Sequence, residues 1–354
     1  MMKRMAAIMF LLVFLFSLCG CHGEELERFF IVTAMAIDWE EDGYVLRLEG
    51  SADEVDENKN PKAILREGRG SNLTQCFLDV QKQTGEYPYT RQTELILLSS
   101  AMPPRQMAHL LDDLLNENGV RLNARVAVTD GKAADLLEEG SFSSQRILKA
   151  VTKGGGTLTS ADIMLRDLAY IRTAAGIDPI LPITCADRTE GLCLLKEDGA
   201  AGQIAPMLTP IFMMAGGTER GGSVTVEVGG KAQAFKLLHN RSRICTDWEK
   251  GQAVVKLAIE AEFRAADLLE RELELYEAAL QGRLERDLQE LVELLKAAGC
   301  DALGFGQSLS RRHPILWKQI EKAWPTHFAA CRILPEISVT ITSTGKLKSG
   351  EEGA

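Results

Sequence analysis

The sequence FIVTAMAID, Phe30–Asp38, begins the part of the chain that decides the fold. It is followed by Glu41-Asp42-Gly43 and then by a second apolar run, Tyr44 to Ala52. Both runs are rich in β-branched, aromatic and small apolar residues, and Asp-Gly between such runs is a strong signal for a β-hairpin. The sequence therefore predicts that the fold begins with two paired strands.

Helix and strand patterns alternate after this hairpin. The polar segment 53–62 has no periodicity and is interpreted as a loop. Apolar spacing predicts helices over 73–81, after Pro103-Pro104, from Ala133 to Glu139, and across 144–175 with an interruption at Gly154–Gly156. Compact strands are predicted at 95–98 and 126–128, and DPILP, 178–182, is expected to be extended. This alternation indicates a mixed α/β region.

The pattern changes after Thr189. Alternating apolar residues predict strands around 224–228, 255–263 and 337–341. Between the last two, leucines at steps of three and four from Leu269 to Leu295 predict a long amphipathic helix, which Gly282 weakens locally and Gly299 ends. We expect an N-terminal α/β region at 21–188 of one or two lobes, a C-terminal domain at 189–345 and a disordered tail at 346–354. The fold class is α+β or mixed α/β, with mixed or antiparallel sheets.

The N-terminus has the pattern of an export signal. Lys3 and Arg4 precede an uncharged run that is too short for a spanning helix, and small residues follow it. The tetrapeptide LCGC, 18–21, resembles a lipobox, so we expect cleavage after residue 20 and lipidation of Cys21. The alternatives are an uncleaved N-terminal helix and a two-cysteine metal site, and the latter lacks the partners to complete four ligands.

Composition and motifs exclude several classes of function. The formal net charge of −10 becomes −12 once the signal is removed, and an acidic chain is a poor ligand for nucleic acid. The glycine clusters do not continue into Gly-Lys-Ser/Thr, the five histidines are scattered, and no serine-hydrolase elbow is complete. We therefore expect no enzyme activity, no metal and no cofactor. Free thiols are favoured for the six cysteines after Cys21, although disulfides stay open.

Several motifs together resemble the Ger(x)C family of spore germination lipoproteins. They occur in family order, from the lipobox to about residue 342: FIVTAMAID at 30–38, EGRGSNL at 67–73 where the family has a Gly-rich turn entering a helix, RLNA at 121–124 with GKAADLL at 131–137, DPILP at 178–182, and DALGFG at 301–306 with HPILW at 313–317 and Trp324. His22 departs from the family pattern, which usually has tryptophan after the lipid-bearing cysteine.

The resemblance implies a three-lobed α/β lipoprotein of the spore inner membrane. Such a protein is the C subunit of a nutrient germinant receptor and acts in assembly or signalling with membrane-embedded A and B subunits. The B subunit is the expected place for the germinant, and no catalytic residues are known in the C subunit. The alternatives from other classes are a solute-binding lipoprotein of a transporter and a surface-anchored cell-wall hydrolase.

The C-terminal motif supplies the remaining candidate site residues. His313-Pro314 suits the start of a helix, because proline is tolerated in the first turn. Leu316, Trp317, Ile320 and Trp324 then form an apolar stripe. Two interpretations remain open: the tryptophans pack in the core, or one of them anchors a partner subunit.

Overall fold

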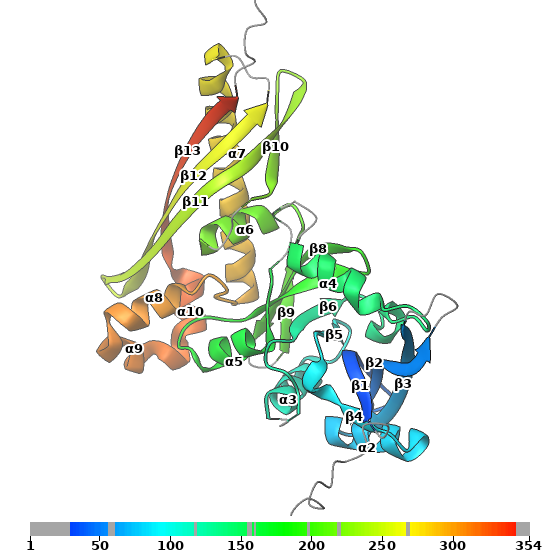
Figure 1. Cartoon of the computed structure of the whole chain (residues 1–354). Coiled ribbons are helices and arrows are strands. Elements are labelled where there is room, and N and C mark those ends of the chain that lie inside the picture. Colours follow the sequence, from blue (N-terminus) through cyan, green and yellow to red (C-terminus); the bar gives the residue numbers. More distant parts are fainter. Residues whose placement is uncertain are drawn as a thin grey trace, which may run out of the picture.

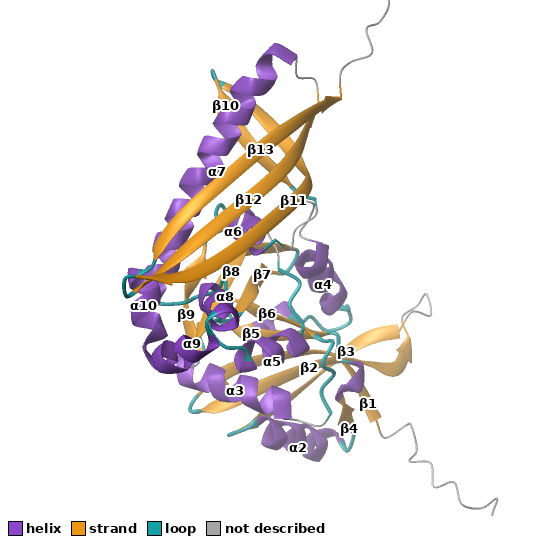
Figure 2. Ribbon diagram, turned by 90° about the vertical axis from the view of Figure 1, so that its left-hand side faces the viewer, coloured by secondary structure: helices purple, strands orange, loops and turns teal. Residues whose placement is uncertain are grey.

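The computed structural model describes residues 29–55, 61–116, 119–153, 158, 161–196, 199–217, 221–266 and 270–344. The expected signal peptide, Cys21 and the C-terminal tail lie outside these residues. The described chain forms two β-sheets with helices packed on both, stacked end to end along an elongated molecule (Figures 1 and 2). The predicted mixed α+β fold class is confirmed.

The first sheet has nine strands and contains both parallel and antiparallel pairs. Its order is β3-β2-β1-β5-β6-β7-β8-β9, with β4 also paired to β1. The strands are β1 (Phe29–Glu40), β2 (Gly43–Val55), β3 (Pro61–Gly70), β4 (Tyr87–Tyr89), β5 (Leu95–Ser99), β6 (Arg125–Thr129), β7 (Ile180–Cys185), β8 (Arg188–Lys196) and β9 (Gly199–Ile204). The strands β1, β5, β6 and β7 are mutually parallel, whereas the outer pairs on both sides are antiparallel.

The predicted hairpin is confirmed. Glu40 pairs with Gly43, and the two residues between them, Glu41 and Asp42, both have positive φ, as a two-residue turn matched to strand twist requires. The loop expected at 53–62 is wrong at both ends, because β2 continues to Val55 and β3 begins at Pro61.

The expected Gly-rich turn at EGRG is also wrong, since these residues form the end of β3. A Cβ on Gly68 would lie 2.2 Å from the carbonyl oxygen of Cys76, so glycine here allows α2 (Leu73–Thr84) to pack directly on the strand. Asn72 then caps the helix, because its side-chain oxygen accepts a hydrogen bond from the backbone N–H of Gln75.

Helices cover both faces of the first sheet. On one face α2, α3 (Pro104–Asn116) and α5 (Leu165–Thr173) bury their apolar sides in one core cluster. On the other face a second cluster contains Ala34 and Ala36 of β1 together with α4 (Ser143–Lys153) and the 3₁₀ helix η3 (Ala133–Leu136). The helix expected from Ala133 to Glu139 is thus only this short 3₁₀ segment.

The second sheet has four strands, β10 (Ser223–Val228), β11 (Lys231–Glu249), β12 (Gln252–Ala266) and β13 (Arg332–Thr344), in sequence order. The first two pairs are antiparallel, but β12 and β13 are parallel. A parallel pair requires a crossover connection. The crossover is built from α7 (Glu270–Ala298), α8 (Phe305–Arg312), α9 (Pro314–Ile320), the 3₁₀ helix η5 (Glu321–Ala323) and α10 (Trp324–Ala330).

The predicted long helix is confirmed as α7. Its leucine stripe from Leu280 to Leu295 is fully buried against the second sheet and α6 (Thr209–Gly216), and the helix ends immediately before Gly299. The same core cluster includes Leu192, Leu194 and Ile204 of β8 and β9. The end of the first sheet and the second sheet therefore share one apolar core, and the first sheet continues past residue 188.

Two buried carboxylates fasten helices to the first sheet. Asp38 accepts hydrogen bonds from the backbone N–H groups of Ala133 and Ala134, at 2.7 and 2.9 Å. Glu49 accepts hydrogen bonds from the backbone and hydroxyl of Ser144, in the first turn of α4. Burial raises the pKa of both carboxyl groups, and these hydrogen bonds oppose that rise because they stabilise the ionised form.

We predict that Asp38→Ala lowers the free energy of unfolding by about 2–4 kcal/mol, because it leaves two backbone N–H groups of η3 without an acceptor. Glu40→Ala is the matched control, because Glu40 lies on the same strand but makes an exposed ion pair with Lys132, which solvent screens. Denaturant unfolding of both variants measures the difference. Equal losses for the two variants would contradict the role assigned to Asp38.

Candidate functional site

Asp301 lies in the loop after α7 and organises the start of α8. Its side chain is buried, and its two oxygens accept hydrogen bonds from the backbone N–H of Phe305 at 2.9 Å and of Gly306 at 2.7 Å. It also accepts one from the indole N–H of Trp324, at 3.0 Å. Burial raises the pKa of the Asp301 carboxyl to about 7, whereas the three donors lower it. A single carboxylate thus joins α8 to α10.

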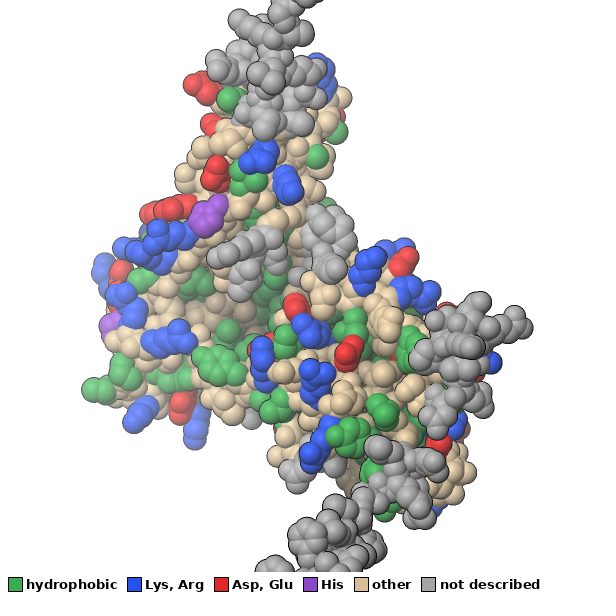
Figure 3. Space-filling view, viewed as in Figure 1, with side chains coloured by type: hydrophobic (Ala, Val, Ile, Leu, Met, Phe, Trp, Pro, Cys, Tyr) green, Lys and Arg blue, Asp and Glu red, His purple; other side chains and the backbone are tan. Residues whose placement is uncertain are grey.

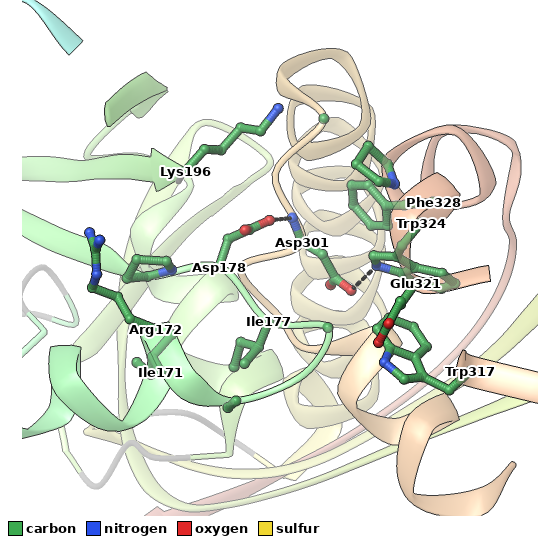
Figure 4. Close-up of a pocket in the computed structure, with 15 residues that line it drawn as sticks. Ile171, Arg172, Ile177, Asp178, Lys196, Asp301, Trp317, Glu321, Trp324 and Phe328 are labelled. Carbon is green, nitrogen blue, oxygen red and sulfur yellow. Dashed lines mark hydrogen bonds between the residues drawn. The ribbon is translucent and has the colours of Figure 1, made fainter. Parts of the chain in front are cut away.

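The backbone of Asp301 connects this loop to the segment before β7. Its N–H donates to the Asp178 carboxylate at 2.6 Å, and the N–H of Asp178 donates to the Asp301 carbonyl at 3.1 Å. The N–H of Gln307 donates to the carbonyl of Gly176 at 2.7 Å. The motifs DPILP and DALGFG, far apart in the sequence, therefore meet at the junction of the two sheets (Figure 4).

Close contacts at this junction require glycine. A Cβ on Gly306 would lie 2.6 Å from Nε1 of Trp324 and 2.9 Å from the Trp317 ring. A Cβ on Gly176, which has positive φ, would lie 2.4 Å from the backbone of Gly306. Glycine at both positions therefore lets the loop, the tryptophans and the segment before β7 approach one another.

The structure brings together the residues predicted at the C-terminal motif. Trp317 and Trp324 are 6% and 5% exposed, with ring centroids 5.3 Å apart, so both pack in the core in the isolated chain. Pro314 occupies the first turn of α9, as expected. His313 contacts Asp247 of β11 at 2.7 Å through Nε2, which holds the α8–α9 turn against the second sheet. Cys21 lies outside the described residues.

Sequence reasoning assigned no role to Asp301 or Asp178. Asp301 precedes the first helical residue by four positions, and an aspartate before a helix start is a local signal that was available. No local signal identifies Asp178, because its partner is 123 residues away.

A cavity of about 370 Å³ opens beside Asp301. One wall contains Trp317, Trp324 and Phe328 with Glu321 at the edge, and Figure 4 shows Arg172, Ile177 and Lys196 on the facing side. Within the described part of the chain, no cluster of His, Cys, Asp or Glu is arranged to hold a metal ion. None of the described helices combines the length and apolar character that a membrane span requires.

The six described cysteines are free thiols. Cys76, Cys193, Cys300 and Cys331 are buried, and burial raises the pKa of each of these four thiols. Cys185 and Cys245 are partly exposed. Buried protonated thiols are poor nucleophiles, which assigns the four a packing role.

The chain was compared with known proteins after this geometry was established. Residues 22–184 match the family model described as the spore germination protein N-terminal domain, and residues 190–345 match the one described as spore germination B3/GerAC like, C-terminal. The chain belongs to the Ger(x)C family. The resemblance inferred from the sequence motifs is therefore confirmed.

Two relatives of the Ger(x)C chain span nearly its whole length. Spore germination protein KC of Bacillus subtilis (strain 168) is 20% identical over 96% of this chain and 94% of its own length. The crystal structure of the GerBC protein matches with a TM-score of 0.60 and 17% identity, over 87% of this chain and 96% of that one. The structural likeness confirms the fold.

We predict that Gly306→Ala destabilises the protein by about 1–3 kcal/mol, because the added methyl group overlaps the tryptophan rings in a packed core. Gly282→Ala is the matched control. Gly282 also lies inside a helix, but the nearest atom to its Cβ position is a flexible arginine end at 3.7 Å, so the gain in helix propensity should stabilise by up to about 1 kcal/mol.

Thermal and denaturant unfolding of the two variants test this prediction. The sign of the change should differ between them. Destabilisation of both variants to the same extent would contradict the close-contact requirement at Gly306.

Proposed function

We propose that this chain is the lipid-anchored, non-catalytic C subunit of a spore germinant receptor, acting in assembly or signalling with membrane-embedded A and B subunits at the spore inner membrane. The observation that carries the proposal is the match of both the N-terminal and the C-terminal family models. In this proposal the B subunit holds the germinant, and the work of the Ger(x)C chain is contact with its partners.

The position of Cys21 supports the anchor. Eight peptide steps separate Cys21 from Phe29, the first residue of β1, and they span at most about 28 Å. Lipid on Cys21 therefore keeps the end of the first sheet that contains the start of β1, together with β4 and α2, close to the membrane (Figure 1). Two or three acyl chains, palmitate among them, give stable binding, whereas one gives only marginal binding.

The lobe formed by α8, α9 and α10 has the properties of a partner contact. Between Phe305 and Ala330 there are four basic residues and one acidic residue, although the whole chain is acidic. Figure 3 shows Lys and Arg side chains gathered over this lobe. Ile315 is 79% exposed among them, on the same short helix as the buried Trp317. An exposed apolar residue surrounded by positive charge fits an acidic partner surface with an apolar pocket.

We predict that Cys21→Ala moves the protein from the membrane fraction to the soluble fraction by about tenfold or more, because the acyl chains supply the binding energy. Nutrient-triggered germination should weaken in the same strain. Cys19→Ala is the control, since it leaves a small residue at that position and the lipid-bearing cysteine in place.

Membrane fractionation and mass spectrometry of the N-terminal peptide measure the outcome. A Cys21→Ala protein that stays membrane-bound and supports germination would rule out this anchor.

We predict that Ile315→Asp reduces co-purification of the A and B subunits about tenfold while the fold is unchanged, because it places an acid in an apolar partner pocket. Leu275→Asp is the matched control, since Leu275 is 56% exposed on α7, away from the lobe. Co-purification from spore membranes, normalised to the amount of Ger(x)C chain, gives the readout. Equal recovery of the subunits with both variants would exclude the lobe as the contact.

A further inference from the structure

The cavity beside Asp301 has the size and position of a small-molecule site. Its volume of about 370 Å³ lies at the lower end of the range usual for such pockets, and it is placed at a junction between packed units, where pockets are frequent. The aromatic wall comes from the α9–α10 region, and the opposite wall comes from α5, the segment before β7 and the end of β8 (Figure 4).

Trp317 supplies an unused hydrogen-bond donor at this cavity. Its indole N–H is buried and has no hydrogen-bond partner among the described residues, whereas the indole N–H of Trp324 is bonded to Asp301. A buried polar group left unpaired costs about 1–3 kcal/mol. In Figure 4 the indole nitrogen of Trp317 lies on the same side as the Glu321 carboxylate, at the cavity. This donor calls for an acceptor on an occupant.

The charges that line the cavity favour an anion on the facing wall. Asp301 and Asp178 already accept backbone N–H groups, and Arg172 is paired with Asp112 at 2.6 Å. Lys196 has no ion pair with any described residue and is only partly exposed. Glu321 lies on the aromatic side, so it directs an anionic group away from that wall and toward Lys196.

The chain's own C-terminal segment does not reach the cavity. β13 begins at Arg332, next to α10, and its 13 residues run away from the cavity for about 40 Å (Figure 1). The ten residues from 345 to 354 span at most about 36 Å. An occupant therefore comes from outside this segment.

We propose that the cavity binds a small carboxylate with an apolar body. The apolar body lies against Trp324 and Phe328, a carbonyl oxygen accepts the indole N–H of Trp317, and the carboxylate faces Lys196. A free metabolite and the C-terminal carboxylate of another protein share this chemistry. The inference does not depend on the lipid anchor or on the receptor subunits.

The test uses the full chain and isothermal titration calorimetry with N-acetyl-L-phenylalanine, compared with its neutral primary amide. The acid should bind about tenfold more tightly than the amide, since loss of one charge-assisted contact corresponds to about 1.4 kcal/mol. Lys196→Met should abolish that preference. Trp317→Phe should weaken both probes about fivefold, because it removes only the N–H donor. Lys318→Met is the control, since Lys318 is exposed on α9 and does not line the cavity.

A five-residue peptide that ends in phenylalanine with a free carboxylate distinguishes the two sources. If it binds as well as the small acid, a protein C-terminus can enter the cavity; if only the small acid binds, the site takes free molecules. The proposal is overturned if neither acid binds at millimolar concentration, if the amide binds as tightly as the acid, or if folded Lys196→Met retains the preference.

Discussion

The hydrogen bonds of the buried Asp301 carboxylate hold the junction of the two sheets together. β12 and β13 are parallel neighbours, so the chain must leave one end of the second sheet and return to it through α7 to α10. Asp301 sits where the long helix ends and the return begins. It satisfies two backbone N–H groups at the start of α8 and the indole of α10, and its backbone pairs with Asp178. Loss of the carboxylate would leave three buried donors unpaired, and such groups cost about 1–3 kcal/mol each.

The first sheet uses the same device. Asp38 and Glu49 project from adjacent strands of the hairpin and accept N–H groups from η3 and from the first turn of α4. A helix N-terminus presents unpaired donors and a partial positive charge, which a carboxylate complements. Small residues such as Ala34 and Ala36 face these helices, and they offer little apolar area to set the helix position. The carboxylates supply the direction that such a shallow apolar contact lacks.

The sequence predicts those elements whose pattern is local. The hairpin, α7, β5, β6, β10, β12 and β13 each have regular apolar spacing that one buried face produces. β11 was missed although it is the longest strand, because a bulge between Leu237 and His239 shifts the alternation and its open face is rich in charged residues. β3 was missed because it is an edge strand with charges and glycines, and its glycines serve the contact with α2.

The candidate site shows the same limit more sharply. DALGFG was recognised as a motif and HPILW as a helix start, yet the function of Asp301 and Gly306 depends on contacts with Trp324, and that of Asp301 also on Asp178. Periodicity carries no information about such pairs, since the residues come from separate elements. The same holds for Trp317 and Trp324, whose stripe on the sequence was compatible with a core and with an interface.

The two tryptophans connect the cavity to the surface of the α8–α10 lobe. Trp324 is fixed by Asp301, so its ring is part of the junction, whereas the N–H of Trp317 has no partner among the described residues. Trp317 lies on α9, a helix of seven residues whose opposite side carries the exposed Ile315. A ligand that pairs with Trp317 would also contact the segment before β7, and so would bias how this short helix packs against the first sheet. Because the helix presents the cavity on one side and the proposed partner contact on the other, occupancy of the cavity and binding of a partner act on the same element, which is the physical requirement for coupling between two sites.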